Sequence, residues 1–277
     1  MVCSSGHSAQ RRETVMTTEP PPFARTTRGS GPGLVLAHGA GGTVETNFGP
    51  ILDHLAAAHT VVGVDYPGAG DTPRSDTPLV ADDLADQLVA AATAEGLDTF
   101  AVAGFSLGGP VAIRAATRHP DRVTALVLTA TFAHANARLR LAAAVWRQLH
   151  EAGDKLLLAK YLSLATFSTS FLESLPPEFL DAALQEFART VPEGTPEHTD
   201  LVQRIDVRDD LAAVRVPTLV ISTTQDPLVT PDLHRRLATD IPGARLVEVD
   251  SGHLPFAECP EEWHRLITDF VAEHQKV

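Results

Sequence analysis

Short apolar runs alternate with amphipathic stretches along most of the chain. The apolar runs end at glycine, proline or polar residues, which is typical of strands buried on both faces of a parallel sheet. They predict strands at residues 33–37, 60–64, 100–103, 123–128, 218–221 and 245–249. The stretches between them place apolar residues three and four positions apart, which predicts helices at 51–58, 79–95, 107–118, 231–240 and 260–274. This alternation predicts an α/β fold with a mostly parallel central sheet and helices on both faces.

The pattern changes between about residues 132 and 204, where strand-like runs disappear. Helical spacing continues there through 139–150, 155–165 and 178–189. Pro176-Pro177 and the segment 192–196 interrupt it, because proline cannot continue a helix. We therefore expect an all-helical insertion between two parts of the α/β core.

The segment 1–22 is polar and rich in proline, and it predicts a flexible tail. Arg11 and Arg12 are not followed by the apolar stretch of an export signal, and Met16 opens a segment that is itself a plausible start. No apolar run reaches the roughly 18 residues that a membrane-spanning helix needs. We therefore expect a soluble protein.

Composition narrows the choice of partner. The 277 residues carry 35 acidic and 22 basic side chains, a formal net charge of −13. This charge opposes attraction to a phosphate backbone or an anionic lipid surface, so neither nucleic acid nor membrane is expected as a partner. Cys3 and Cys259 are too few for a disulfide framework or a zinc site, and they are compatible with a reducing cytoplasm. No metal is expected, since His54 and His59 are five positions apart and do not share a helix face.

The strongest chemical signal is the run Gly104-Phe105-Ser106-Leu107-Gly108, directly after a predicted strand and before a predicted helix. A serine raised on such a sharp turn adopts a strained backbone, and side chains two positions away would collide with the neighbouring chain. Amides at the start of the helix would point toward the serine oxygen, where negative charge develops during acyl transfer. This context favours a nucleophile over a glycine-rich turn with an incidental serine.

A nucleophilic serine needs a base and a group that orients the base. Asp226 and His253 each follow a predicted strand. The carboxyl ends of parallel strands lie along one edge of a sheet, so these loops can converge on Ser106. The order Ser106, Asp226, His253 matches that of hydrolase triads, while Asp250 is a second candidate for the acid.

A second glycine-rich segment, His38-Gly39-Ala40-Gly41-Gly42, follows the first predicted strand. Its open backbone allows close approach to a substrate, and we expect the amides of Ala40 and Leu107 to form an oxyanion hole. The alternative is a phosphate-binding loop. It is disfavoured because no helix begins with Gly-Lys-Ser or Gly-Lys-Thr, and the glycines at 29–33 precede their strand instead of following it.

With these segments in this order, the chain from about residue 23 onward resembles the α/β-hydrolase superfamily. The turn Asp65-Tyr66-Pro67-Gly68-Ala69-Gly70 and the segment Glu258-Cys259-Pro260-Glu261-Glu262 also match it. The likeness is greatest to the serine esterase, lactonase and enol-lactone hydrolase branch, and Ser106 argues against relatives with an aspartate nucleophile. It implies a core of 23–132 and 206–277, a helical cap of 133–205, a small-molecule substrate and no cofactor. Because the segment before Gly33 is short, the first strands of the fold are expected to be abbreviated.

The predicted function is hydrolysis of an ester, lactone or thioester of a small to medium, largely apolar acyl compound. Ser106 would attack, His253 would accept the proton, Asp226 would orient the imidazole, and water would resolve the acyl-enzyme. Residues expected around the substrate are Gly39, Phe105, Phe132, Trp146, Tyr161, Phe171 and Leu254. Aromatic residues of the insertion, Phe167 among them, are nevertheless more often cap core than substrate contacts.

Two alternatives stay open. One is a different reaction at the same site: hydrolysis of a carbon–carbon bond, acyl transfer or cyclisation. The other is a receptor that keeps the triad and uses the cavity for binding.

Overall fold

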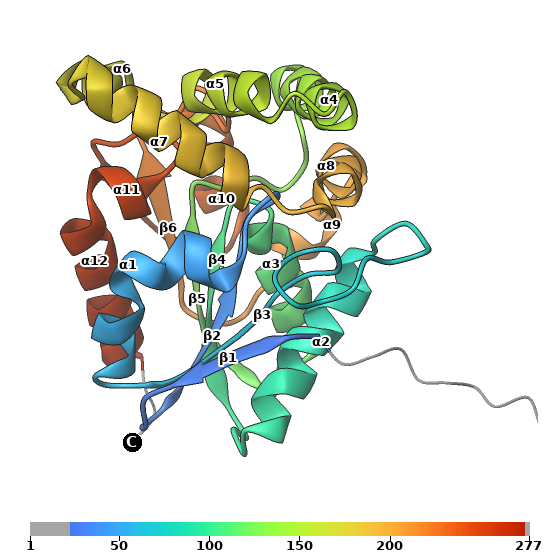
Figure 1. Cartoon of the computed structure of the whole chain (residues 1–277). Coiled ribbons are helices and arrows are strands. Elements are labelled where there is room, and N and C mark those ends of the chain that lie inside the picture. The colour runs from blue at the N-terminus through green and yellow to red at the C-terminus, as the bar shows by residue number, and fades with distance from the viewer. Residues whose placement is uncertain (1–22, 275–277) are drawn as a thin grey trace, which may run out of the picture.

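The computed structural model describes residues 23–274 and contains a seven-stranded sheet between two layers of helices (Figure 1). The strands lie in the order β1-β3-β2-β4-β5-β6-β7, and all pair in parallel except β1, which runs antiparallel to β3. The mostly parallel sheet predicted from the sequence is thus confirmed. The predicted tail at 1–22, with the second start at Met16, lies outside the described residues. The strands are β1 Arg25–Arg28, β2 Gly33–Ala37, β3 Thr60–Val64, β4 Phe100–Phe105, β5 Val123–Thr129, β6 Thr218–Thr223 and β7 Arg245–Val249.

Helices surround the sheet on both faces and at one end. They are α1 Val44–Ala56, α2 Ala81–Ala94, α3 Gly108–Arg118, α4 Ala137–Glu151, α5 Lys155–Thr166, α6 Thr169–Ser174, α7 Pro177–Thr190, α8 Thr195–Arg204, α9 Arg208–Leu211, α10 Pro231–Asp240, α11 Pro255–Glu258 and α12 Pro260–Glu273.

Two hydrophobic cores lie on opposite faces of the sheet, because successive strand residues point to opposite sides. Val35 and Ala37 of β2 pack into one core with apolar residues of α2, α3 and α10. Leu34 and Leu36 pack into the other with residues of α1 and α12. Strands β2 to β6 carry no charged residue, since both of their faces are covered.

Local capping explains where two helices begin. Helix α1 starts before the predicted residue 51, because the Thr43 hydroxyl accepts a hydrogen bond from the Thr46 amide at 3.0 Å and the Thr46 hydroxyl accepts one from the Thr43 amide at 2.8 Å. Helix α8 starts at Thr195, inside the segment 192–196 that was predicted to break the helical pattern. Pro196 lies in its first turn, where proline is tolerated, so that prediction is wrong beyond Gly194.

The helices between β5 and β6 form a separate group. In Figure 1, α4, α5, α6 and α7 lie together at the top, beyond one end of the sheet. Contacts of α4 with α5 and α8, and of α5 with α7, hold the group together. Ala159, Leu184 and Ala188 form a small hydrophobic core within it. The group occupies the part of the chain predicted as a helical insertion.

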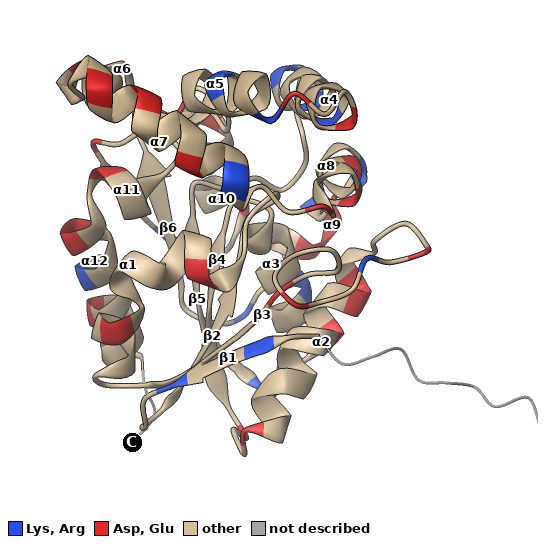
Figure 2. Cartoon of the chain, viewed as in Figure 1, with Lys and Arg blue, Asp and Glu red and all other residues tan. Residues whose placement is uncertain are grey.

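Charged residues lie mainly on the helices and loops. Figure 2 shows acidic positions spread over helices of both layers and of the upper group, with no concentration of basic positions in view. No helix within residues 23–274 is long and apolar enough to cross a bilayer.

Candidate active site

Ser106 lies on a sharp turn between β4 and α3. Its φ of 52° is in the left-handed region, which a residue with a side chain adopts only under strain. The glycines on either side make the turn possible. A Cβ on Gly104 would lie 2.5 Å from the Gly108 carbonyl oxygen, and a Cβ on Gly108 would lie 1.9 Å from the Ala37 carbonyl oxygen. Ser106 therefore projects from the end of the strand, as the sequence predicted from these glycines.

Hydrogen bonds to β5, to the loop after it and to α3 hold this strained turn in place. The Ser106 amide donates to the Thr129 carbonyl at 3.0 Å, and the Thr131 hydroxyl donates to the Ser106 carbonyl at 2.5 Å. The Gly109 amide donates to the same carbonyl at 3.0 Å. With both polar backbone groups of Ser106 bonded, the surrounding structure stabilises a conformation that the residue would not adopt alone.

Asp226, His253 and Ser106 form a continuous hydrogen-bonded series. Nδ1 of His253 lies 2.7 Å from Oδ2 of Asp226, and Nε2 lies 3.0 Å from Oγ of Ser106. A carboxylate only accepts, so Nδ1 carries the proton and Nε2 can accept the serine hydroxyl proton. All three side chains are buried, with exposed fractions of 3% for Asp226, 3% for His253 and 7% for Ser106.

The structure places Asp226, and not Asp250, beside the histidine. Oδ1 of Asp226 accepts from the amides of Leu228 and Val229 at 2.8 Å each, which fixes the carboxylate after β6. Asp250 is exposed and accepts from the Gln225 side-chain amide at 2.5 Å. Of the two acids considered from the sequence, only Asp226 is in contact with His253.

A second buried histidine, His234 of α10, lies behind the acid, and sequence reasoning did not identify it. Its Nε2 is 4.0 Å from Oδ2 of Asp226, and its Nδ1 is 3.2 Å from the Ser222 hydroxyl. Burial lowers the pKa of His234 to about 4, so its ring is neutral near pH 7. No pattern in the sequence distinguishes it from other helical histidines.

The loop that carries His253 is held by what we call the Glu258 clamp, formed by Glu258, Gly252 and Ser168. Glu258 accepts from the Gly252 amide at 2.9 Å, from the Ser168 amide at 3.0 Å and from the Ser168 hydroxyl at 2.6 Å. The His253 amide donates to the Thr166 carbonyl at 2.6 Å. The histidine loop is therefore bonded directly to the segment between α5 and α6.

Two backbone amides beside Ser106 are free: one in the glycine-rich loop after β2 and one directly after the serine. Within residues 23–274, the amides of Ala40 and Leu107 have no acceptor.

The Gly39 amide donates to Oδ1 of Asn47 at 2.8 Å, and the Gly39 carbonyl lies 2.8 Å from Nδ1 of His38. Nε2 of His38 accepts from the Tyr66 amide at 2.9 Å, so Nδ1 carries the proton and donates to Gly39. Burial lowers the pKa of His38 to about 3, which keeps this ring neutral.

A mainly apolar cavity of about 470 Å³ opens beside Ser106 and His253. Four residues predicted to surround the substrate line it: Phe105, Trp146, Phe171 and Leu254. The structure places the other three outside the lining. Phe132 is only 1% exposed and packs in the same hydrophobic core as Val35 and Ala37, and the Tyr161 hydroxyl donates to the Ala142 carbonyl at 2.8 Å. Gly39 packs against Phe105, since a Cβ on Gly39 would lie only 2.9 Å from an atom of the Phe105 ring.

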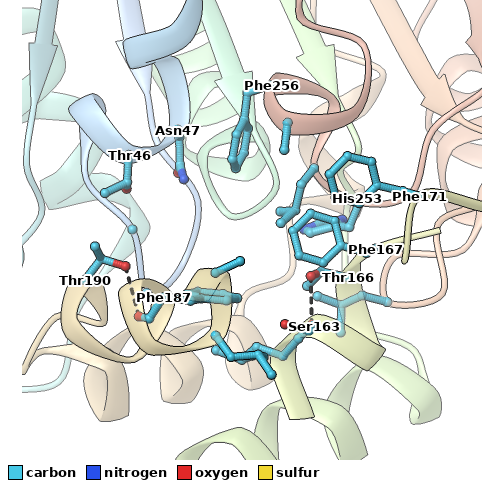
Figure 3. Close-up of a pocket in the computed structure, with 18 of the residues that line it drawn as sticks. Thr46, Asn47, Ser163, Thr166, Phe167, Phe171, Phe187, Thr190, His253 and Phe256 are labelled. Atoms are coloured by element: carbon cyan, nitrogen blue, oxygen red, sulfur yellow. Dashed lines mark hydrogen bonds between the residues drawn. The ribbon is translucent and has the colours of Figure 1, made fainter. Parts of the chain in front are cut away.

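Most of the lining residues are ones that the sequence analysis did not name. Figure 3 shows Phe167 and Phe171 on the His253 side of the cavity and Phe187 and Thr190 on another wall. The rings of Phe167 and Phe171 stack with centroids 4.8 Å apart. Helix α7 contributes Leu180, Leu184 and Phe187, spaced as one face of a helix. This spacing is visible in the sequence, and it could have identified the residues of this wall.

In the described part of the chain, no three His, Cys, Asp or Glu side chains are grouped so as to hold a metal ion. Asp65, in the turn after β3, has a structural contact: it accepts from the Val44 amide at 2.8 Å and so fixes the start of α1.

Comparisons with known proteins give relatives along nearly the whole chain. A family model described as alpha/beta hydrolase fold matches residues 32–260. The chain is 34% identical over 245 residues to pyrrolizixenacetamide deacetylase of Xenorhabdus hominickii, covering 88% of this chain and 92% of that protein. It is 31% identical over 254 residues to pimeloyl-acyl carrier protein methyl ester esterase of Neisseria meningitidis serogroup B, covering 86% and 92%. The crystal structure of the enol-lactonase from Burkholderia xenovorans LB400 matches with a TM-score of 0.78 and 25% identity, covering 90% of this chain and 96% of that one.

Proposed function

The chain belongs to the α/β-hydrolase family, and we propose that it hydrolyses an ester, lactone or thioester of a neutral, largely apolar acyl compound of small to medium size. Ser106 is the nucleophile in this proposal, His253 the base and Asp226 the residue that orients the base. The observation that carries the proposal is the hydrogen-bonded series from Asp226 to Ser106, which ends at the wall of an apolar cavity.

Each group in the series has one task in the proposed reaction. Oγ of Ser106 attacks the substrate carbonyl while its proton moves to Nε2 of His253 and then to the leaving group. The amides of Ala40 and Leu107 donate to the oxygen that becomes negative, which stabilises the transition state. A water molecule, deprotonated by His253, then attacks the acyl-enzyme and releases the acid and Ser106.

The cavity supports a neutral acyl group. Its walls are mainly Leu, Phe and Ala, and among residues 23–274 only Glu186 and His253 line it with an ionisable side chain. A carboxylate on the acyl chain would lose hydration there without a basic partner, which is costly. The volume of about 470 Å³ is within the range of small-molecule sites, roughly 300–1,000 Å³.

The names of the relatives support acyl chemistry. One is a deacetylase, one a methyl ester esterase, and the structural neighbour is an enol-lactonase. We propose the same class of bond for this chain, with the acyl group selected by its own cavity.

We also propose that residues 133–205 act as a cap on a core made of residues 23–132 and 206–277. Ser106 and His253 come from core loops, whereas Leu162, Phe171 and Leu184 come from helices of the proposed cap, and all five line the same cavity. In this arrangement the core supplies the chemistry and the cap encloses the acyl group.

A panel of p-nitrophenyl esters tests the proposed function. We expect repeated turnover of the butyrate, hexanoate and octanoate esters, and covalent labelling of Ser106 by a fluorophosphonate, located by mass spectrometry. The mono-p-nitrophenyl ester of succinic acid is the matched control, because it has the chain length of butyrate with a carboxylate in place of the terminal methyl group. Its kcat/KM should be lower than that of butyrate by about 10-fold or more, since the cavity offers the charge no partner.

Three other results would replace the proposal. Ligand binding without turnover would identify a receptor. Products that carry an added alcohol or amine in place of water would identify acyl transfer. Turnover of a diketone with no turnover of any ester would identify carbon–carbon bond hydrolysis.

The cavity-lining aromatic residues of the proposed cap should set acyl-chain preference. Phe171→Ala and Trp146→Ala enlarge the cavity, and side-chain contacts of this size change specificity by roughly 10- to 200-fold. We therefore expect the ratio of kcat/KM for octanoate to that for butyrate to change by that factor. The fluorophosphonate labelling rate should stay within about threefold of wild type, because the nucleophile is unaltered.

Phe179→Ala on α7 is the matched control for this series, since Phe179 is 63% exposed and does not line the cavity. It should leave the ratio unchanged. An unchanged ratio in Phe171→Ala and Trp146→Ala would show that the acyl chain does not occupy this part of the cavity.

A further inference from the structure

His198 of α8 connects two loops of the core from inside the protein. Its side chain is fully buried, with an exposed fraction of 0%. Nδ1 lies 3.1 Å from the Gly41 amide nitrogen, and Nε2 lies 3.0 Å from the Pro67 carbonyl oxygen. One imidazole thus contacts both the glycine-rich loop beside Ser106 and the turn after β3.

These two partners define the form of the ring. A backbone amide only donates and a carbonyl only accepts, so Nδ1 is bare and Nε2 carries the proton. Burial lowers the pKa of His198 to about 4, and the neutral ring that can accept from Gly41 is therefore present near pH 7.

The Gly41 hydrogen bond fixes the peptide next to a proposed oxyanion donor. The Gly39 carbonyl and the Ala40 amide share one peptide plane, which His38 holds through its bond to Gly39. The Ala40 carbonyl and the Gly41 amide share the next plane, which His198 holds. Ala40 lies between two fixed planes, so the direction of its amide depends on both bonds. Gly41 has a φ of 65°, and a glycine can also adopt many other backbone conformations. The hydrogen bond to His198 favours this one conformation over the others.

The attachment of α8 to the core does not depend on His198. The Gly194 amide donates to the Gly68 carbonyl at 2.9 Å, and Arg74 forms an ion pair with Glu197. Leu201 and Val202 of the same helix are buried in the main hydrophobic core. A change at His198 can therefore alter the glycine-rich loop while the helix stays in place.

We propose that His198 is a positioning residue of the oxyanion hole, which orients the Ala40 amide by accepting a hydrogen bond from the next amide in the chain. This inference rests on the proposed hydrolase function, in which Ala40 donates to the oxyanion. It assigns to the insertion a task in transition-state stabilisation in addition to enclosing the substrate.

Two substitutions separate the bonds of this one side chain. In His198→Asn the side-chain oxygen can take the place of Nδ1 and accept from Gly41, and the bond to Pro67 is lost. In His198→Gln the side-chain amide nitrogen can take the place of Nε2 and donate to Pro67, and the bond to Gly41 is lost. Both variants are neutral and polar, so they differ mainly in which bond remains.

We expect His198→Gln to lower kcat for p-nitrophenyl butyrate by about 10- to 100-fold with KM within about threefold of wild type, because a misplaced donor weakens the transition state more than the ground state. His198→Asn should keep kcat within about fivefold. Leu201→Ala is the packing control: it should lower the unfolding temperature and leave kcat within about twofold, since it removes buried contacts of α8 only.

Equal kcat values for the two variants, or a change confined to KM, would overturn the proposal. If His198→Gln does not fold, His198→Ala tests the same point, because it also removes the Gly41 bond. A kcat of His198→Ala within threefold of wild type would overturn the proposal. The Gly41 amide proton shift in glycine-labelled protein is a readout independent of activity. It should move upfield in His198→Gln and stay near its wild-type position in His198→Asn. If wild type hydrolyses no ester, the proposed function fails, while the amide shift still reports whether His198 holds the loop.

Discussion

Ser106→Ala should lower kcat for p-nitrophenyl butyrate by about 10³-fold or more and leave the fold intact. The substitution removes the oxygen that would attack the carbonyl, and the residual rate comes from binding and the oxyanion donors alone. Alanine retains the Cβ that already tolerates the turn at φ 52°, and the bonds from Thr131 and to Thr129 involve only the backbone of residue 106. The unfolding temperature should therefore change little.

Steady-state kinetics and mass spectrometry after fluorophosphonate treatment check this result. Ser30→Ala, in the exposed loop before β2, is the control for a serine with no part in the site, and it should retain full activity and labelling. A folded Ser106→Ala protein with near wild-type turnover would contradict the nucleophile assignment and, with it, the proposed function.

Asp226→Asn should lower kcat by on the order of 10³- to 10⁴-fold, whereas Asp250→Asn should change it by less than about threefold. An asparagine amide can donate to Nδ1 of His253, which favours the ring with its proton on Nε2, and that ring cannot accept from Ser106. Asparagine Oδ1 can still accept from the Leu228 and Val229 amides, so the loop after β6 should keep its shape.

The comparison needs both variants at the same pH, with circular dichroism to show that each is folded. Asp250 is exposed and bonds to Gln225 and not to His253, so its substitution serves as the matched acid control. A larger loss in Asp250→Asn than in Asp226→Asn would transfer the acid to Asp250 and would mean that the loop rearranges in solution.

Elements with a local apolar signal were predicted well from the sequence, and elements without one were missed. Strand β3 has the predicted bounds because its apolar run is continuous. Strands β4 and β6 extend past the predicted ends, since Gly104, Ser222 and Thr223 are buried and remain paired although they are not apolar. Strand β1 was missed because its sequence, Arg-Thr-Thr-Arg, has no apolar residue and lies at the edge of the sheet.

The candidate site divides in the same way. The order of serine, aspartate and histidine after β4, β6 and β7 identified the three residues that the structure brings together. The cavity was predicted less well, because aromatic residue type does not tell which face of a helix a side chain occupies: Trp146 lines the cavity and Tyr161 does not. Contacts such as that of His198 with Gly41 join residues 157 positions apart, and no local pattern indicates them.

The Glu258 clamp also limits how this chain can be recombined with its relatives. A chimaera spliced at residues 133 and 205 would take Thr166 and Ser168 from the donor and Glu258 and His253 from the recipient. Both Ser168 bonds of the clamp and the bond from His253 to Thr166 would then cross the splice, and only the bond from Gly252 to Glu258 would stay within the recipient. The donor segment would keep the histidine in place only if it supplied a hydroxyl at 168 and a carbonyl aligned with the His253 amide. Transfer of a relative's substrate range to this chain therefore depends on these contacts between the donated segment and the histidine loop. It depends also on the volume that the donated helices enclose.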